Sequence, residues 1–281
     1  MTSTEAAAED VQTKFEDIQI SFPKGEMSFQ VANDEDQKVY FCLGVRKSGS
    51  TMFSRILTFL ARRNQINVVD LPGTAFRSGF TVADWEKADL SEIMKPGNLF
   101  SGFRALPQGI ANSENFKSAS KVFMFRDPRD ALISQYYSDA FSHKLPEEGT
   151  PGRELFLKKR AEARSTGIDD YVLKHARNMG STMLGCSDLL NDPTCACFRY
   201  EDYVFQKRRM IHKIIKHFDW QCHPGQIENI LREIDVVPEA EDTKKFIRKA
   251  VPGDHVNKLE PQTIRRLNKH LEECMTVFDY Y

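Results

Sequence analysis

The sequence predicts one α/β domain over residues 18–281, a parallel β-sheet with helices on both faces. Apolar runs of strand length alternate with helical patterns, which is typical of a parallel sheet whose strands are joined by helical crossovers. Two of these runs also end in short polar segments with an informative composition. The strand-like runs are centred near Phe41, Val69, Phe100, Phe123 and Phe198. The later helical patterns cover about residues 169–184, 205–218, 224–233 and 261–276.

Size and composition agree with one domain, because 281 residues with 41% hydrophobic content can bury one core of this class. Residues 1–17 are polar and acidic, so we expect a disordered tail and no signal peptide. A short β-rich lead-in follows this tail. Residues 144–167 break the alternation with prolines, glycines and then charged residues. We expect this segment to be an insertion or a mobile cover beside a site.

The first polar segment follows the strand-like run 39–44. It contains Lys47, two small hydroxyl side chains and Gly49, and apolar residues recur at helical spacing from Met52 onward. A strand, a tight loop and a helix in this order direct backbone N–H groups and the positive end of a helix dipole at one point, which suits a phosphate. Gly49 permits close backbone approach, and Lys47 adds a mobile cation.

The spacing differs from that of the nucleoside-triphosphate P-loop. That loop has two glycines five residues apart followed by Lys-Ser/Thr, whereas Lys47 here precedes the single glycine. We therefore expect a shorter loop that holds one phosphate rather than a triphosphate with Mg²⁺. An ordinary strand-to-helix turn with a solvated lysine fits this segment, taken alone, equally well.

A second strand running into a helix covers residues 121–134. Asp127 is a good N-cap, which places Arg126 at the carboxyl end of the strand and Ser134 about two turns into the helix. Ligands of parallel sheets collect at the carboxyl ends of the strands, so Arg126 can meet a second anionic group there. The alternative is a surface ion pair such as Arg126 with Asp130, which would contribute little.

Taken together, the two elements resemble the sulfotransferase family, whose donor is 3′-phosphoadenosine 5′-phosphosulfate (PAPS). In that family a Lys-Ser-Gly-Thr/Ser-Thr loop holds the 5′-phosphosulfate, and an Arg with a Ser eight residues later holds the 3′-phosphate. Residues 47–51, Arg126 and Ser134 match these motifs in order. The resemblance implies a sulfotransferase domain of P-loop-NTPase-like architecture.

Two further segments extend the resemblance to about residues 38–280. Residues 198–202 resemble the family's Tyr-Glu-Asp segment, in which the tyrosine lies near the adenine. Residues 246–255 resemble the Arg-Lys-Gly…Gly-Asp loop that closes on the 3′-phosphate. The donor-binding residues implied by the family are Lys47, Ser48, Gly49, Ser50, Thr51, Met52, Arg126, Ser134, Tyr200, Arg248 and Lys249.

The resemblance implies transfer of a sulfuryl group to a hydroxyl or amine of a small-molecule acceptor, with release of adenosine 3′,5′-bisphosphate (PAP). Lys47 would then be catalytic and donate to the bridging oxygen of the leaving phosphate, for which a flexible ammonium is suited. The protein supplies the compensating charge, and the sequence shows no cluster of metal ligands. We therefore expect no metal.

The sequence departs from the family pattern at several positions. Arg46 stands where cytosolic members have Pro, Met52 where they have Trp, and Ala250 where Gly is usual. Phe103 stands where many members have the catalytic His, and phenylalanine cannot accept a proton.

The catalytic base therefore has to be sought elsewhere. His143, which follows the Ser134 helix, is our candidate, and Asp139 and His255 are weaker alternatives. A lone histidine is more often a surface or hydrogen-bonded residue than a base.

Composition also limits the partners. The formal net charge of −1 gives no reason to expect nucleic acid or an anionic membrane surface, and no apolar stretch is long enough for a membrane span. The six scattered cysteines are interpreted as reduced structural thiols, and we expect a cytoplasmic protein.

Aromatic and acidic residues share the expected acceptor loops, which suits an amphipathic and even a cationic acceptor. The sequence indicates no oligomeric state.

Two other functions fit parts of the sequence. A small-molecule kinase with a degenerate P-loop would depend on ATP and Mg²⁺, and the missing second glycine counts against it. A catalytically weak nucleotide-binding module would agree with Phe103 and Ala250.

Overall fold

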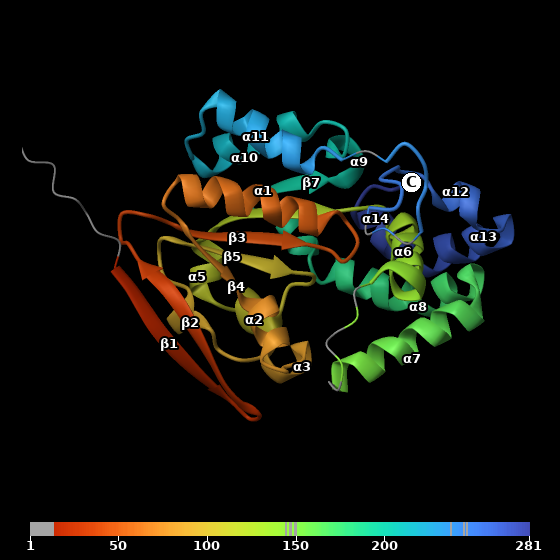
Figure 1. The fold of residues 1–281 in the computed structure, drawn as a ribbon, viewed down its shortest axis with the longest axis horizontal. Helices are drawn as coiled ribbons and strands as arrows, with labels where there is room; N and C mark the ends of the chain where they lie inside the picture. The colour runs from red at the N-terminus through yellow and green to blue at the C-terminus, as the bar shows by residue number, and fades with distance from the viewer. Residues whose placement is uncertain are drawn as a thin grey trace, which may run out of the picture.

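The computed structural model describes residues 14–143, 145, 148, 151–236, 238–243, 245 and 247–281. Its centre is a five-stranded sheet in the order β4-β5-β3-β6-β7, and every neighbouring pair is parallel (Figure 1). All five predicted strand-like runs are strands of this sheet, which confirms the predicted fold class. The strands are β3 (Val39–Gly44), β4 (Asn67–Asp70), β5 (Asn98–Phe103), β6 (Ser120–Phe125) and β7 (Cys195–Arg199).

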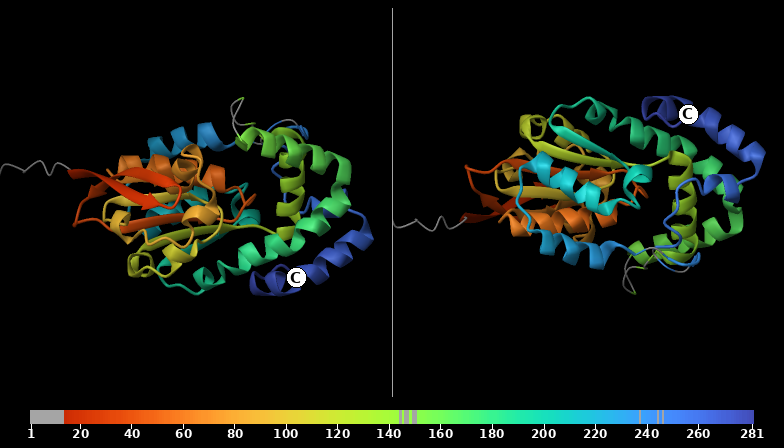
Figure 2. Two further views of the ribbon diagram at one scale, coloured as in Figure 1. Left: turned by 90° about the horizontal axis from the view of Figure 1, so that it is seen from below. Right: turned by 90° about the horizontal axis from the view of Figure 1, so that it is seen from above.

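Each face of the sheet carries its own hydrophobic core. One core joins the sheet to α1 (Ser50–Arg63), α10 (Lys207–Phe218) and α11 (Pro224–Ile234). The other joins it to α6 (Pro128–Tyr137) and α8 (Ile168–Leu184), and to the C-terminal helices α13 (Pro261–His270) and α14 (Glu272–Val277). Figure 2 shows α8 and the C-terminal helices at the same end of the molecule. Because both faces are covered, β3 and β6 are continuous apolar runs without alternation.

A separate antiparallel hairpin of β1 (Lys14–Phe22) and β2 (Gly25–Asn33) lies beside the sheet (Figure 1). The expected disordered tail was therefore wrong for residues 14–17, which belong to β1. These residues are mostly polar and exposed, but the backbone of β2 pairs with them as far as Lys14 opposite Asn33. Residues 1–13 lie outside the described part of the chain.

The predicted insertion at 144–167 is largely helical. Pro151–Thr166 form α7. The helix packs on the π-helical turn η2 (Ser138–Ser142), where the Arg164 Nε donates to the Ala140 carbonyl at 2.8 Å. Residues 144, 146, 147, 149 and 150 lie outside the described residues, and a lid role for the segment stays a prediction.

The remaining elements are short. Within the described residues, no helix is long and apolar enough to cross a membrane. All six cysteines are free thiols. The short helices are α2 (Leu71–Arg77), α3 (Val82–Trp85), η1 (Ser91–Ile93), α4 (Gln108–Ala111), α5 (Glu114–Ser118), η3 (Ser187–Leu190), α9 (Tyr200–Tyr203) and α12 (His255–Lys258).

Candidate functional site

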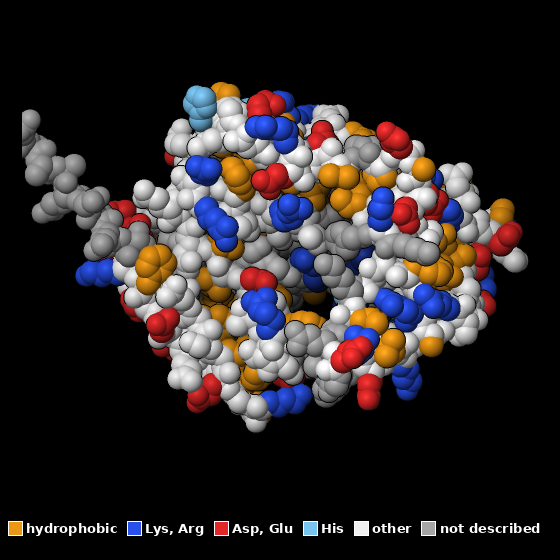
Figure 3. Space-filling view, viewed as in Figure 1, with side chains coloured by type: hydrophobic (Ala, Val, Ile, Leu, Met, Phe, Trp, Pro, Cys, Tyr) orange, Lys and Arg blue, Asp and Glu red, His pale blue; other side chains and the backbone are white. Residues whose placement is uncertain are grey.

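The predicted site residues surround one cavity of about 590 Å³ beyond the carboxyl ends of β3 and β6. They come from segments far apart in the sequence, as the resemblance required. Figure 3 shows the face of the molecule that is hollowed near its centre, with lysine and arginine side chains around the hollow. Of the predicted residues, the following line the cavity: Lys47, Gly49, Ser50, Thr51, Met52, Arg126, Ser134, His143, Tyr200, Arg248 and Lys249.

Ser48 is the exception. Its side chain is fully buried, and its hydroxyl donates to the carbonyl oxygens of Val45 at 2.6 Å and Met124 at 3.2 Å. Its backbone N–H donates to the Val45 carbonyl at 3.1 Å. Ser48 therefore ties the loop to β6, and its contact with phosphate stays a prediction.

The loop reaches α1 through two left-handed residues. Lys47 has φ 66° and Gly49 has φ 82°, and α1 begins at Ser50. A Cβ at Gly49 would lie 2.9 Å from two ring carbons of Tyr200, so the loop and the ring are in close contact. Since the first N–H groups of a helix lack intrahelical partners, the start of α1 presents donors to the cavity.

Lys47 is a cation in a cationic environment. Burial lowers its pKa to about 8, and the nearby charges of Arg126, Arg46 and Arg104 act in the same direction. The Asp139 carboxylate opposes this shift. Lys47 is therefore mostly protonated at neutral pH but gives up its proton far more readily than an exposed lysine, which suits a donor to a departing oxygen.

Arg126 connects three parts of the site. Its guanidinium lies over the Tyr200 ring at 4.4 Å. Its two terminal nitrogens donate to the backbone carbonyls of Lys47 and Val251, each at 3.4 Å. Its Nε is buried and has no hydrogen-bond partner among the described residues. Such an orphaned donor fits an anionic ligand that completes its hydrogen bonds.

Asp130 holds the C-terminal loop against Arg126, a role that sequence reasoning missed. Its carboxylate accepts from the backbone N–H groups of Gly253 at 2.5 Å and His255 at 3.0 Å, and it lies 2.7 Å from the His255 Nδ1. Arg126 is 3.6 Å away. Burial alone would raise the pKa of Asp130, but the His255 hydrogen bonds and the Arg126 charge outweigh it and bring the pKa to about 2.

The loop ahead of this anchor supplies two further cations. Arg248 pairs with Asp254 and Glu241 and lies over the Tyr137 ring at 4.3 Å. Lys249 lies 3.0 Å from the buried Asp254. Ala250, where the family has Gly, is left-handed with φ 56°, so this backbone form is kept without glycine.

The two histidines considered as the catalytic base have different environments. His255 is buried and bonded to Asp130, which makes it structural. His143 is exposed at the cavity, with its ring 4.6 Å from that of Phe156. Phe103, at the family's usual histidine position, is buried against the ring of Phe41.

Asp139 lies at the cavity on η2, and a hydrogen-bonded chain holds it in place. The Tyr171 hydroxyl donates to its Oδ2 at 2.5 Å, and the Gln135 Nε2 donates to the Tyr171 hydroxyl at 3.2 Å. Burial, followed by the bond to Asp139, raises the pKa of Tyr171, so the proton stays on the tyrosine. No sequence signal pointed to Tyr171, because it lies on α8, 32 residues after Asp139 in the chain.

No cluster of three or more metal-ligating side chains occurs in the described ranges of the chain.

The strand-loop-helix cradle, the cationic cavity and the sheet order define an α/β protein that binds anionic groups at the carboxyl edge of its sheet. The model of the sulfotransferase domain family matches residues 37–279. The chain therefore belongs to the sulfotransferase family, and it is a transferase of the class that moves sulfuryl groups.

One solved structure shares this fold, and a second is reported for comparison. Mouse sulfotransferase SULT7A1, solved in complex with PAP, superposes with a TM-score of 0.57 at 15% identity, over 88% of this chain and 89% of that one. A sulfotransferase from Alicyclobacillus acidocaldarius gives a TM-score of 0.43 at 12% identity, over 87% and 95% of the two chains. A search of curated proteins found no match.

Proposed function

We propose that this enzyme transfers the sulfuryl group of PAPS to a hydroxyl or amine of a small-molecule acceptor and releases PAP. The charge of the cavity is the observation that carries this proposal. In the described part of the chain, nine lysine and arginine side chains line it against two carboxylates. A donor with a phosphosulfate at one end and a 3′-phosphate at the other matches such a lining, because each anion meets its own set of cations.

The two sets lie on different segments. Lys47 and the start of α1 are positioned for the 5′-phosphosulfate. Arg126, with its orphaned Nε, and Ser134 on α6 are positioned for the 3′-phosphate, together with Arg248 and Lys249. PAP in the mouse structural neighbour supports the same nucleotide here.

In the transfer step, the acceptor oxygen or nitrogen forms a bond to sulfur while the bond between sulfur and the bridging phosphate oxygen breaks. The electron pair of that bond stays on the bridging oxygen of the departing PAP, and the Lys47 ammonium donates a hydrogen bond to that oxygen. The acceptor proton passes to a base at the same end of the cavity. Asp139 is our preferred base, because Tyr171 fixes its orientation. His143 is the second candidate.

The setting of the enzyme is part of the same proposal. We place it in the cytoplasm, where its six free cysteines would stay reduced, and we expect neither nucleic acid nor membrane among its partners. The reaction as written uses no metal ion.

Thermal unfolding with PAP, compared with ADP and with ATP and Mg²⁺, tests the donor site. PAP at a hundred times its Kd should stabilise the protein by about 2.7 kcal/mol without Mg²⁺. Stabilisation by ATP and Mg²⁺ alone would favour the kinase alternative. PAP binding without transfer of labelled sulfuryl to any of a panel of phenols, alcohols and amines would favour the binding module.

A further inference from the structure

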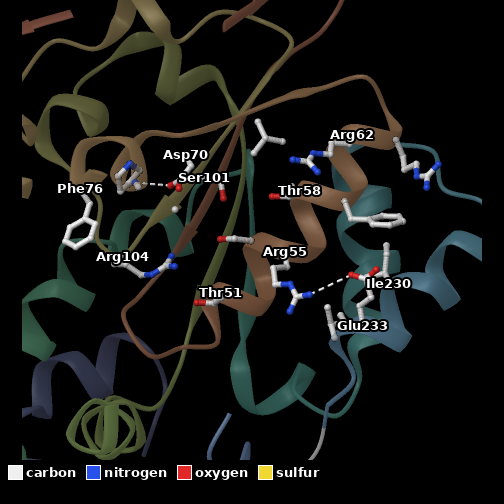
Figure 4. Close-up of a pocket in the computed structure, with 18 residues that line it drawn as sticks. Thr51, Arg55, Thr58, Arg62, Asp70, Phe76, Ser101, Arg104, Ile230 and Glu233 are labelled. Atoms are coloured by element: carbon white, nitrogen blue, oxygen red, sulfur yellow. Dashed lines mark hydrogen bonds and ion pairs between the residues drawn. The ribbon is translucent and has the colours of Figure 1, made fainter. Parts of the chain in front are cut away.

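A second cavity, of about 900 Å³, runs beside the donor site along α1 (Figure 4). Its walls come from α1, α11, α2 and the carboxyl ends of β4 and β5. Thr51, Arg55 and Arg104 line both cavities, so the two cavities adjoin at these residues. Of the predicted donor-binding residues, Thr51 alone takes part in it.

Four arginines line the second cavity: Arg55, Arg62, Arg63 and Arg104. Figure 4 shows Arg55, Arg62 and Arg104 reaching into it from α1 and from the end of β5. Within the described residues, Arg62, Arg63 and Arg104 form no ion pair with a carboxylate. Their charges are available to a ligand.

The two carboxylates of the cavity are already engaged. Glu233 lies 3.7 Å from Arg55. Asp70 accepts from the Gly73 N–H at 3.0 Å as the cap of α2 and lies 3.6 Å from Arg77. The cavity therefore has a net positive charge. Asp84, an acid of the expected acceptor loops, pairs with Lys24 at 2.7 Å and is likewise engaged.

Apolar surface accompanies these charges. Phe76 on α2 is 58% exposed and lines the cavity, and Phe59, Val68 and Ile230 add further apolar lining. Together these side chains form an apolar part of the wall beside the arginines. A ligand with an apolar body and an anionic group matches both features.

Helix geometry sets the length of such a ligand. Thr51 lies in the first turn of α1, next to the phosphate loop, and Arg62 lies in the last turn. At 1.5 Å per residue, Arg62 is about 16 Å further along the helix axis. We propose that the second cavity holds the acceptor, an elongated amphipathic molecule with a reactive hydroxyl near Lys47 and a carboxylate or sulfate about three helical turns away, at Arg62. The inference rests on the proposed sulfuryl transfer.

The chemistry needs no reagent other than PAPS. The acceptor hydroxyl oxygen forms the new bond to sulfur, and its proton leaves to the base. The bond from sulfur to the 5′-phosphate breaks, and its electron pair stays on PAP. The anionic group of the acceptor is unchanged and serves only for binding.

A matched pair of acceptors tests the inference. ω-Hydroxydodecanoate carries a hydroxyl at one end and a carboxylate at the other, and dodecane-1,12-diol replaces the carboxylate with a second hydroxyl. Transfer from labelled PAPS should show kcat/KM about tenfold higher for the hydroxy acid, a difference of about 1.4 kcal/mol. Arg62→Glu should abolish this preference, and Arg62→Gln should weaken it. The control Arg266→Glu, on α13 away from the cavity, should leave it intact.

Equal kcat/KM values for the two acceptors, transfer to neither, or an undiminished preference in Arg62→Glu would overturn the inference. PAP-induced thermal stabilisation is measured in the same samples. If PAP does not stabilise the wild-type protein, the donor site itself is refuted. This outcome separates failure of the proposed function from failure of the acceptor site.

Discussion

Lys47 should impose a characteristic pH dependence on donor use. With a pKa of about 8 in the free protein, it is about nine-tenths protonated at pH 7 and about one-tenth protonated at pH 9. Because kcat/KM reports the ionisation of the free enzyme, kcat/KM for PAPS should fall about tenfold between these pH values. The fall in kcat should come at higher pH, since the bound phosphosulfate favours the charged lysine.

The assay is initial-rate transfer of labelled sulfuryl between pH 6 and pH 10, with a phenol as test acceptor. Lys47→Arg is the control: its guanidinium stays charged over this range, so its lower rate should show no such break. A wild-type kcat/KM that stays level or rises to pH 10 would refute the reasoning, because Lys47 would then not be needed in its charged form.

The same pKa makes a prediction about stability. A buried lysine whose folded pKa lies below its unfolded value of 10.5 costs stability below pH 8, and the cost disappears as the pH rises from 8 towards 10.5. Lys47→Met removes the charge and keeps most of the volume, so its free energy of unfolding at pH 7 should be about 3 kcal/mol higher than that of the wild-type protein, while turnover is lost. Denaturant unfolding at pH 7 and at pH 10.5 measures this, and equal gains at both values would contradict the assignment.

Two other outcomes follow from the site. Gly49→Ala should abolish PAP-induced stabilisation, because its Cβ would meet the Tyr200 ring at 2.9 Å; Gly79→Ala, equally left-handed but with open space around it, controls for backbone strain. Asp139→Asn should lower kcat at least a hundredfold with PAP binding unchanged, and His143→Ala should lower it less than threefold; the reverse order would identify His143 as the base.

The sequence was most informative where one local rule decides the structure. Strands buried on both faces are continuous apolar runs, so composition alone was enough to predict β3 and β6 as strands. The Asp127 cap fixed the start of α6, and with it the place of Arg126 at the sheet edge.

The remaining site residues depend on pairing between distant segments. Asp130 binds a loop 123 residues further along, and Tyr171 binds Asp139 across 32 residues. No spacing rule links such positions. Ser48 has the residue type of a phosphate ligand, yet its hydroxyl bonds β6, because the turn before α1 directs it inwards. The helix α7 was not predicted because its sequence is mostly charged. Its buried side chains, such as Ala163, pack on η2 and α8, which are distant contacts that the sequence pattern does not show.

The side chains proposed to hold the 3′-phosphate are already held in place by the protein itself. Arg126 lies near Asp130, and Arg248 pairs with Asp254, so each arginine is held by a carboxylate that is itself fixed by the loop 248–255. The ordering of these side chains therefore costs little at the moment of binding. A nucleotide without a 3′-phosphate would leave the buried Arg126 Nε without a partner, and such an unmet donor costs about 1–3 kcal/mol. If the proposed donor is correct, we therefore expect discrimination between PAPS and ATP to come from groups that are already in place, rather than from a rearrangement that the donor has to drive.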